Sequence, residues 1–175
     1  MPDYNITSVV NTPSDQIVTK DFIIANFGPA IGEIYVADGS TTQSFPTGTT
    51  YTKLTAFTTN GASINCTADA TNDKITITKA GYYLVNCVVS GYDGATGAEF
   101  KMALFKNGVE QENIHATNKY NAGSEIDNME MCGIISVIAT DYVDVRLRHG
   151  SGGSVNFTTQ YANLTITFQP NNIVI

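Results

Sequence analysis

Hydrophobic and polar positions alternate with a period of two along most of this chain, as they do in half-buried β-strands. The clearest case is residues 73–90, where two such runs are joined at residues 79–81. The second run is apolar on one face and mostly apolar on the other; the faces are Tyr83, Val85, Cys87 and Val89, and Tyr82, Leu84, Asn86 and Val88. A strand with two apolar faces has to be covered on both sides. We therefore expect one face to lie in the core and the other to meet a neighbouring subunit.

Similar short runs recur along the rest of the sequence, and no stretch has a useful helical period. The predicted strands cover residues 33–36, 51–58, 62–67, 74–78, 82–90, 99–106, 109–115, 129–138, 142–148, 155–161 and 164–168. Asn60-Gly61 and Asn107-Gly108 are predicted hairpin turns, because Asn and Gly both accept a positive φ. Polar loops are expected at 40–50 and 116–124. Many short strands separated by turns predict an all-β sandwich or jelly roll.

Several short motifs follow one another in a fixed order between residues 33 and 169. They are F-T-T-N-G at 57–61, I-T-I-T-K-A-G-Y-Y-L-V at 75–85, L-F-K-N-G at 104–108, I-A-T-D-Y-V-D-V-R-L at 138–147 and N-L-T-I-T-F at 163–168. As an ordered set they resemble the globular head of complement-like proteins and the tumour necrosis factor jelly roll. The opening G-E-I-Y-V with its Thr-rich loop is similar to such domains in bacteriophage structural proteins. The resemblance implies a jelly-roll β-sandwich of about ten antiparallel strands that forms a compact trimer.

These patterns divide the chain into an N-terminal arm at 1–32, a jelly-roll domain at 33–169 and a C-terminal tail at 170–175. In the trimer, Tyr82, Leu84 and Val88 are the predicted subunit contacts. The arm has more apolar residues than a solvated tail, so we expect it to bind a partner surface. The predicted anchor residues are Ile17, Val18, Phe22, Ile23, Ile24 and Phe27. The alternative is that the arm packs along its own trimer.

Composition limits the class of partner. The chain is 42% hydrophobic and 14% charged, which fits one folded domain with a real core. Its net charge is -7 and no Lys/Arg cluster is visible, so no nucleic-acid partner is expected. The N-terminus lacks the charged and apolar regions of a signal peptide, and no run is long enough to span a membrane. We therefore expect synthesis in a cytoplasm and no membrane partner.

The sequence offers little that would support catalysis. His115 and His149 are placed at loop edges, and neither a G-x-S-x-G nor an H-E-x-x-H motif occurs, so no enzyme is expected. No closely spaced Cys or His pair indicates a metal or cofactor site. The three cysteines, an odd number at wide spacing, are interpreted as free buried thiols; they are Cys66, Cys87 and Cys132.

For two sets of charged residues, the sequence leaves a ligand-binding role open as an alternative. Four acidic residues could supply the oxygen ligands that calcium prefers, although solvated carboxylates are the preferred interpretation: Asp93, Glu99, Glu125 and Asp127. Arg146 and Arg148 share one face of the strand at 142–148 with Asp144. A paired or solvated strand edge is preferred there over an anion site.

Two functions of different classes remain. The preferred one is a non-enzymatic virion structural protein, namely a homotrimeric capsid decoration or head-fibre protein of a bacteriophage. Its partners would be its own copies and the major capsid protein or another virion protein, and it would reside in the virion after synthesis in the host cytoplasm. The alternative is a trimeric receptor- or glycan-binding adhesin or tail-tip module. A tip protein is usually projected by a long stalk, whereas nearly all of this chain is one domain, and the fold alone does not decide.

Overall fold

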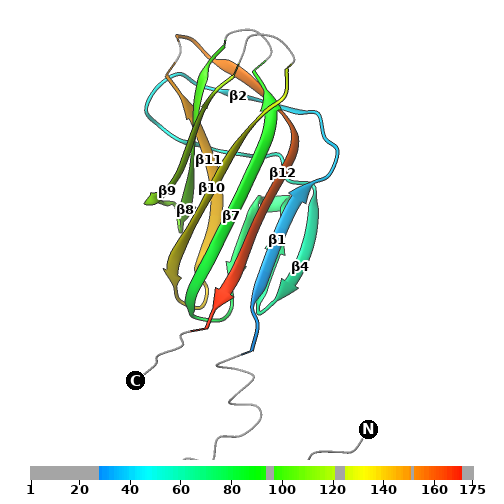
Figure 1. Ribbon diagram of the computed structural model, residues 1–175, viewed down its shortest axis with the longest axis vertical. Coiled ribbons are helices and arrows are strands. Elements are labelled where there is room, and N and C mark those ends of the chain that lie inside the picture. The colour runs from blue at the N-terminus through cyan, green and yellow to red at the C-terminus, as the bar shows by residue number, and fades with distance from the viewer. Residues whose placement is uncertain (1–27, 94–96, 121–124, 151, 171–175) are drawn as a thin grey trace, which may run out of the picture.

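The computed structural model describes residues 28–93, 97–120, 125–150 and 152–170. Twelve strands lie in these ranges: β1 Ile31–Val36, β2 Thr41–Phe45, β3 Thr52–Lys53, β4 Thr59–Ile64, β5 Cys66–Asp69, β6 Lys74–Ile77, β7 Gly81–Tyr92, β8 Glu99–Lys106, β9 Val109–Lys119, β10 Asp127–Val137, β11 Tyr142–His149 and β12 Val155–Gln169. One 3-10 turn, η1 Ala70–Asn72, connects β5 to β6. The strands form two antiparallel sheets that stack as a jelly-roll sandwich (Figure 1). The all-β jelly roll is thus confirmed, with twelve strands in place of about ten.

We call the two sheets the front sheet and the back sheet. The front sheet has the order β10-β7-β12-β1-β4, with β2 paired to the first part of β12, and it faces the viewer in Figure 1. The back sheet has the order β5-β6-β11-β8-β9, with β3 paired to β11. β7 and β12, at 12 and 15 residues, are the long central pair of the front sheet. The two faces predicted for residues 82–90 therefore lie in the middle of this sheet.

The core lies between the sheets and follows the predicted strand parity. Tyr83, Val85, Cys87 and Val89 point inward from β7 and are at most 4% exposed. At the upper end of the sandwich an aromatic cluster closes the core, with Phe100 5.8 Å from Phe45 and 5.1 Å from Phe157 between ring centroids. Among the described residues, these core side chains are buried within one chain alone.

One of the two predicted hairpin turns is confirmed. Asn107 and Gly108 have φ angles of 51° and 79° and join β8 to β9. Asn60-Gly61 is instead part of β4, and the prediction of a turn there is wrong. The Asn60 side chain accepts the Ala70 N–H at 2.7 Å, which gives its oxygen a tertiary role. A Cβ at Gly61 would collide with the Glu33 carboxylate, so the glycine serves close packing rather than chain reversal.

Several strand boundaries differ from the sequence pattern. The predicted loop at 40–50 contains β2, in which Phe45 is fully buried and the other residues are polar. The predicted strand at 51–58 is regular only at Thr52–Lys53, and Leu54 and Thr58 add single backbone hydrogen bonds to β11 and β1. The strand β9 continues to Lys119. The last two predicted strands are one strand, β12, with a register shift between Thr159 and Tyr161. Each difference reflects pairing with a distant strand, which a local pattern does not contain.

β1 starts, and β12 ends, at the same end of the sandwich (Figure 1). Phe168 N donates to Ala30 O at 2.8 Å, and Lys79 Nζ donates to Gly28 O at 2.5 Å, so the chain is held from its first described residue. The predicted anchor residues Ile17 to Phe27 lie outside the described residues. Within the described ranges, no helix has the length and apolar character to cross a membrane.

Candidate functional site

The outer face of the front sheet, which we call the front face, collects side chains from four adjacent strands. The pairing register aligns them in rows across β10, β7, β12 and β1. The rows are Ile134–Leu84–Thr167–Ile31, Cys132–Asn86–Thr165–Glu33 and Glu130–Val88–Asn163–Tyr35. The three predicted trimer-contact residues, Tyr82, Leu84 and Val88, alternate along β7 and all belong to this face.

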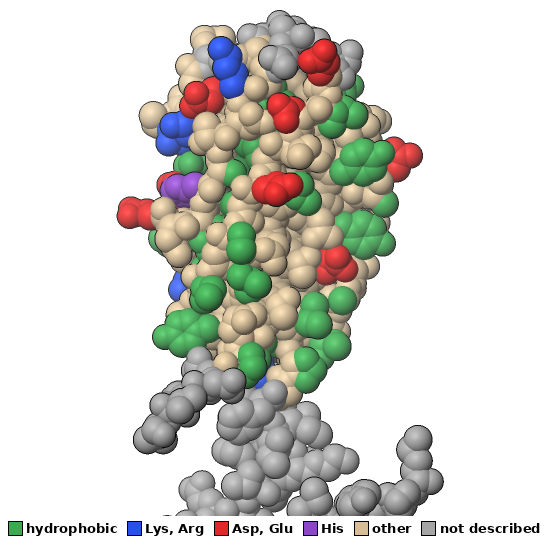
Figure 2. All heavy atoms as spheres, in the orientation of Figure 1, with side chains coloured by type: hydrophobic (Ala, Val, Ile, Leu, Met, Phe, Trp, Pro, Cys, Tyr) green, Lys and Arg blue, Asp and Glu red, His purple; other side chains and the backbone are tan. Residues whose placement is uncertain are grey.

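The front face exposes apolar groups that the core does not use. Ile134 is 54% exposed and Tyr82 is 47% exposed, while Leu84 and Val88 are half-buried. Tyr161, 48% exposed, extends the face towards the start of β12. Figure 2 shows hydrophobic side chains over its lower half, with most charged side chains at the upper end and along the edges. An apolar area of this kind on a soluble domain is typical of an interaction surface.

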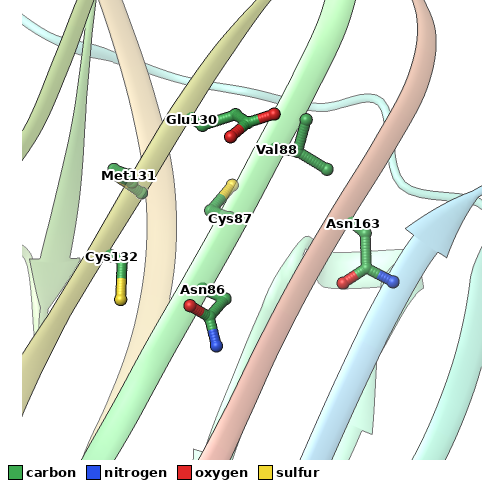
Figure 3. Close-up of a pocket in the computed structure, with 7 residues that line it drawn as sticks. All are labelled: Asn86, Cys87, Val88, Glu130, Met131, Cys132 and Asn163. Carbon is green, nitrogen blue, oxygen red and sulfur yellow. The ribbon is translucent and has the colours of Figure 1, made fainter.

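A shallow hollow of about 420 Å³ interrupts the front face between β10, β7 and β12 (Figure 3). Its outward-pointing side chains are Asn86, Val88, Glu130, Cys132 and Asn163. On one side the wall is fixed, because Asn163 Nδ2 donates to Glu33 at 2.7 Å and Thr165 donates to Asn163 Oδ1 at 2.6 Å.

The other side of this hollow is unconstrained by comparison. Among the described residues, no hydrogen bond or ion pair holds the side chain of Asn86 or Glu130. Both side chains face outward next to Cys132: Asn86 lies opposite it on β7, and Glu130 lies two residues before it on β10. They therefore retain hydrogen-bonding capacity for whatever covers the front face.

The thiols divide into two environments. Cys66 and Cys87 are buried, and burial raises the pKa of Cys66 to about 11 and that of Cys87 further still. Both thiols therefore stay protonated at neutral pH, and the protonated thiol is a poor nucleophile. Cys132 is exposed on the front face, so its prediction as a buried thiol is wrong. It follows the buried Met131 on β10, and alternation turns it outward.

Neither histidine belongs to a catalytic arrangement in the described part of the chain. His149 is at a loop edge as predicted, because it is the last residue of β11, but it is buried at 1% exposed and its Nε2 lies 2.7 Å from Phe45 O. His115 lies inside β9 and not at a loop edge, so that prediction is wrong; its Nε2 is 3.0 Å from Glu110 and its ring stacks on Tyr51. The described hydrogen bonds link neither ring to a serine or cysteine, so no nucleophile–base pair is formed by them. The absence of enzymatic activity stays a prediction.

The predicted alternatives for the charged residues have different outcomes. In the described ranges, no group of three or more potential ligand side chains could hold a metal ion. Asp93 is 3% exposed and accepts the Ala98 N–H, so it is not a solvated carboxylate. Asp144 pairs with Arg146, whose Nε and Nη2 lie 2.7 and 3.2 Å from its two carboxylate oxygens. The predicted pairing of Arg146 is thus confirmed, but β11 lies between β6 and β8 in the middle of the back sheet, so the prediction of a strand edge is wrong.

Sequence reasoning missed part of the front face. Ile134 and Cys132 on β10, Tyr35 on β1 and Tyr161 on β12 lie beside the predicted contacts. Alternation within β10 could have turned Ile134 outward. Gly133 and Ile135 on either side of it, however, make the local run apolar on both faces, and the pairing register joins residues far apart in sequence.

Comparison with solved structures identifies the architecture. The Eiger tumour necrosis factor of S. frugiperda superposes with a TM-score of 0.59 at 10% identity, over 81% of this chain and 92% of that one. The globular domain of zebrafish complement 1qA gives 0.56 at 13% identity, over 79% and 95%. Murine APRIL at pH 5.0 gives 0.51 at 10% identity, over 81% and 99%. The chain has a tumour necrosis factor-like jelly-roll fold. No protein-family model matches this jelly roll, and no curated protein sequence does.

Proposed function

We propose that this jelly roll forms a homotrimer through its front face, and that the trimer is a non-enzymatic virion structural protein. Its role would be that of a capsid decoration or head-fibre protein of a bacteriophage, held to the major capsid protein or another virion protein by residues 1–27. The observation that carries the proposal is the front face itself. It exposes Ile134 and Tyr82 beside Leu84 on a sandwich whose described core side chains are buried within one chain alone.

The size of the front face fits a self-association surface. The five strands in the row of the front sheet have 11, 12, 15, 6 and 6 residues, and at a strand spacing of about 4.8 Å and a rise of about 3.3 Å per residue they span roughly 790 Å². A specific interface of standard size buries about 800 Å² on each partner. The outer face of these five strands is therefore about as large as one standard interface, without any rearrangement of the fold.

The resemblance set out above favours a second and third copy of this chain as the occupants. A trimer would also turn three N-terminal arms towards one end, because β1 starts there in every copy. Three linked arms dissociate from a surface far more slowly than one arm, because the second and third binding events are effectively intramolecular once the first arm is bound. This supports attachment to a repetitive surface such as a capsid.

The experiment has two arms that separate assembly from attachment. Light scattering of the full chain at micromolar concentration is expected to give the mass of three chains, and a monomer mass would overturn the trimer. Deleting residues 1–27 is expected to leave a folded trimer that no longer adds to virus particles lacking the protein. A truncated trimer that still binds such particles would overturn the anchoring role and leave the trimer standing.

A further inference from the structure

Two arginines of one strand face have different environments. Arg146 is paired through two of its nitrogens with Asp144. Arg148, one alternation further along β11, has a buried Nε with no hydrogen-bond partner in the described part of the chain. Its guanidinium lies instead over the ring of Tyr51, 4.8 Å from the centroid. Packing on Tyr51 rather than a carboxylate therefore holds Arg148 in place, and its positive charge is not neutralised by a paired acid as that of Arg146 is.

Arg148 lines a hollow of about 500 Å³ at the upper end of the back sheet. Lys101 lies directly opposite it, because the β8–β11 register pairs these two residues. Two like charges opposite one another across strands destabilise a sheet unless something neutralises them. Within the described residues, the nearest compensation is Glu99, whose carboxylate is 3.8 Å from Lys101 Nζ and more than half exposed. The hollow therefore holds two cations against one weakly engaged carboxylate.

The hollow is also accessible. Its walls include Gly48 and Gly150, and a Cβ placed on either would meet no atom within 4 Å. The loop that carries Gly48 is held to β11 by a hydrogen bond from Gly48 N to His149 O at 3.2 Å. Thr49 adds a hydroxyl beside the two cations. The two cations therefore line an open hollow with polar groups, and the loop that forms part of its wall is hydrogen-bonded to β11.

We propose that this hollow binds the carboxylate of an acidic sugar. The formal charge of Lys101, Arg148 and Glu99 together is +1, which matches a monoanion better than a phosphate dianion. A carboxylate can accept two N–H groups from one guanidinium, the geometry that Arg146 already shows with Asp144. The Thr49 hydroxyl and the open backbone at Gly48 can hydrogen-bond the ring hydroxyls of a sugar, which distinguishes it from a simple carboxylate.

The position of this site is compatible with a trimer. It lies on the back sheet, so covering the front face would leave it free in all three copies. A shallow, polar hollow is expected to bind a single sugar weakly, and three copies on one particle would add avidity. The inference does not depend on the virion role, because it rests on the back sheet alone.

The test is a calorimetric titration of the full chain with sodium glucuronate and, separately, with N-acetylneuraminate. At least one should bind saturably, and which one binds identifies the class of acidic sugar. Glucose, the neutral analogue, should bind at least tenfold more weakly. Inorganic phosphate is the competing anion. No saturation by either acidic sugar, equal binding of glucose, or tighter binding of phosphate would each overturn the proposal.

Variants connect the binding to the named side chains. Arg148→Gln is expected to weaken binding at least tenfold, and Arg148→Lys to recover only part of it because an ammonium lacks the planar fork. Lys101→Gln should weaken it severalfold, and it carries the test if Arg148→Gln does not fold. Lys74→Gln is the matched control, since Lys74 also lies over a tyrosine, Tyr142, but at the opposite end of β11. Equal losses in the control and the Arg148 variants would overturn the assignment.

Discussion

Truncating Ile134 to alanine is the cleanest perturbation of the proposed trimer. The Ile134 side chain points out of the sandwich, is 54% exposed in the single chain, and lies opposite Leu84 in the register of β10 and β7. The substitution therefore removes apolar surface from the front face and leaves the core of the monomer intact. We expect a weaker trimer and an unchanged monomer fold.

The magnitude follows from the exposed fraction. Burying a whole isoleucine side chain contributes about 1.5–3 kcal/mol. Because 54% of Ile134 is still exposed, covering the front face recovers roughly half of that, or about 1 kcal/mol per chain. Three copies give about 3 kcal/mol, which is roughly a hundredfold in the dissociation constant of the trimer. The midpoint concentration varies as the square root of that constant, so it should rise by about tenfold.

Sedimentation velocity over a dilution series from nanomolar to micromolar protein measures this midpoint. Val109→Ala is the matched control, because Val109 is 65% exposed at the β8–β9 turn and belongs to the back sheet rather than the front sheet. The control should leave the midpoint unchanged, and both variants should keep the thermal midpoint of unfolding of a fully dissociated sample. An unchanged midpoint for Ile134→Ala, or an equal change for both variants, would refute the assignment of the front face.

Three further outcomes test the fold. Asp141→Ala should destabilise the chain by about 1–3 kcal/mol in urea at neutral pH, because the carboxylate accepts the Ile138 N–H at 2.9 Å and the Asn107 amide at 2.6 Å. Burial raises the pKa of Asp141, but the two hydrogen bonds and the charge of Lys106 together outweigh it, and the pKa is lowered. The loss of stability relative to the parent chain should therefore be present above about pH 4 and shrink as the pH falls below it. Gly91→Ala should lower the thermal midpoint by the equivalent of about 1–3 kcal/mol, because the new Cβ would meet a backbone carbonyl of β12. Thiol titration of the unreduced, denatured chain should count three free cysteines, and in the dissociated native chain only Cys132 should react. A single thiol in the denatured chain, or a second thiol that reacts rapidly in the native chain, would contradict the buried placement of Cys66 and Cys87.

The alternation of residues 82–90 was sufficient to predict which side chains of β7 lie in the core and which belong to the front face. Strand geometry alone sends Tyr83 and Val85 inward and Tyr82 and Leu84 outward, whatever the strand pairs with. The Asn107-Gly108 turn was predictable for a similar reason, since its two positive φ angles are a local backbone requirement. Features set by the backbone of a few consecutive residues can be read from sequence.

Features that depend on distant partners could not be read in this way. Asn60-Gly61 has the composition of a turn, but Glu33 and Ala70 determine its place in β4. The pocket of Arg148 depends on Lys101 from β8 and on Tyr51 from the loop before β3. From the sequence, Arg146 and Arg148 are equivalent, because each lies on the same face of one strand. Their different roles come from the single carboxylate within reach of one and not the other.

The two ends of the sandwich separate attachment from presentation. Residues 1–27 join the described chain at Gly28, beside the end of β12, while Gly48, Lys101 and the end of β11 lie at the end where β12 starts (Figure 1). The 15 residues of β12 place these ends about 46 Å apart at a rise of about 3.3 Å per residue. If the arm binds a capsid, the hollow around Arg148 therefore points away from the particle surface. A decoration protein attached in this orientation would present three acidic-sugar sites outward, so the structural function and the binding function can belong to the same trimer.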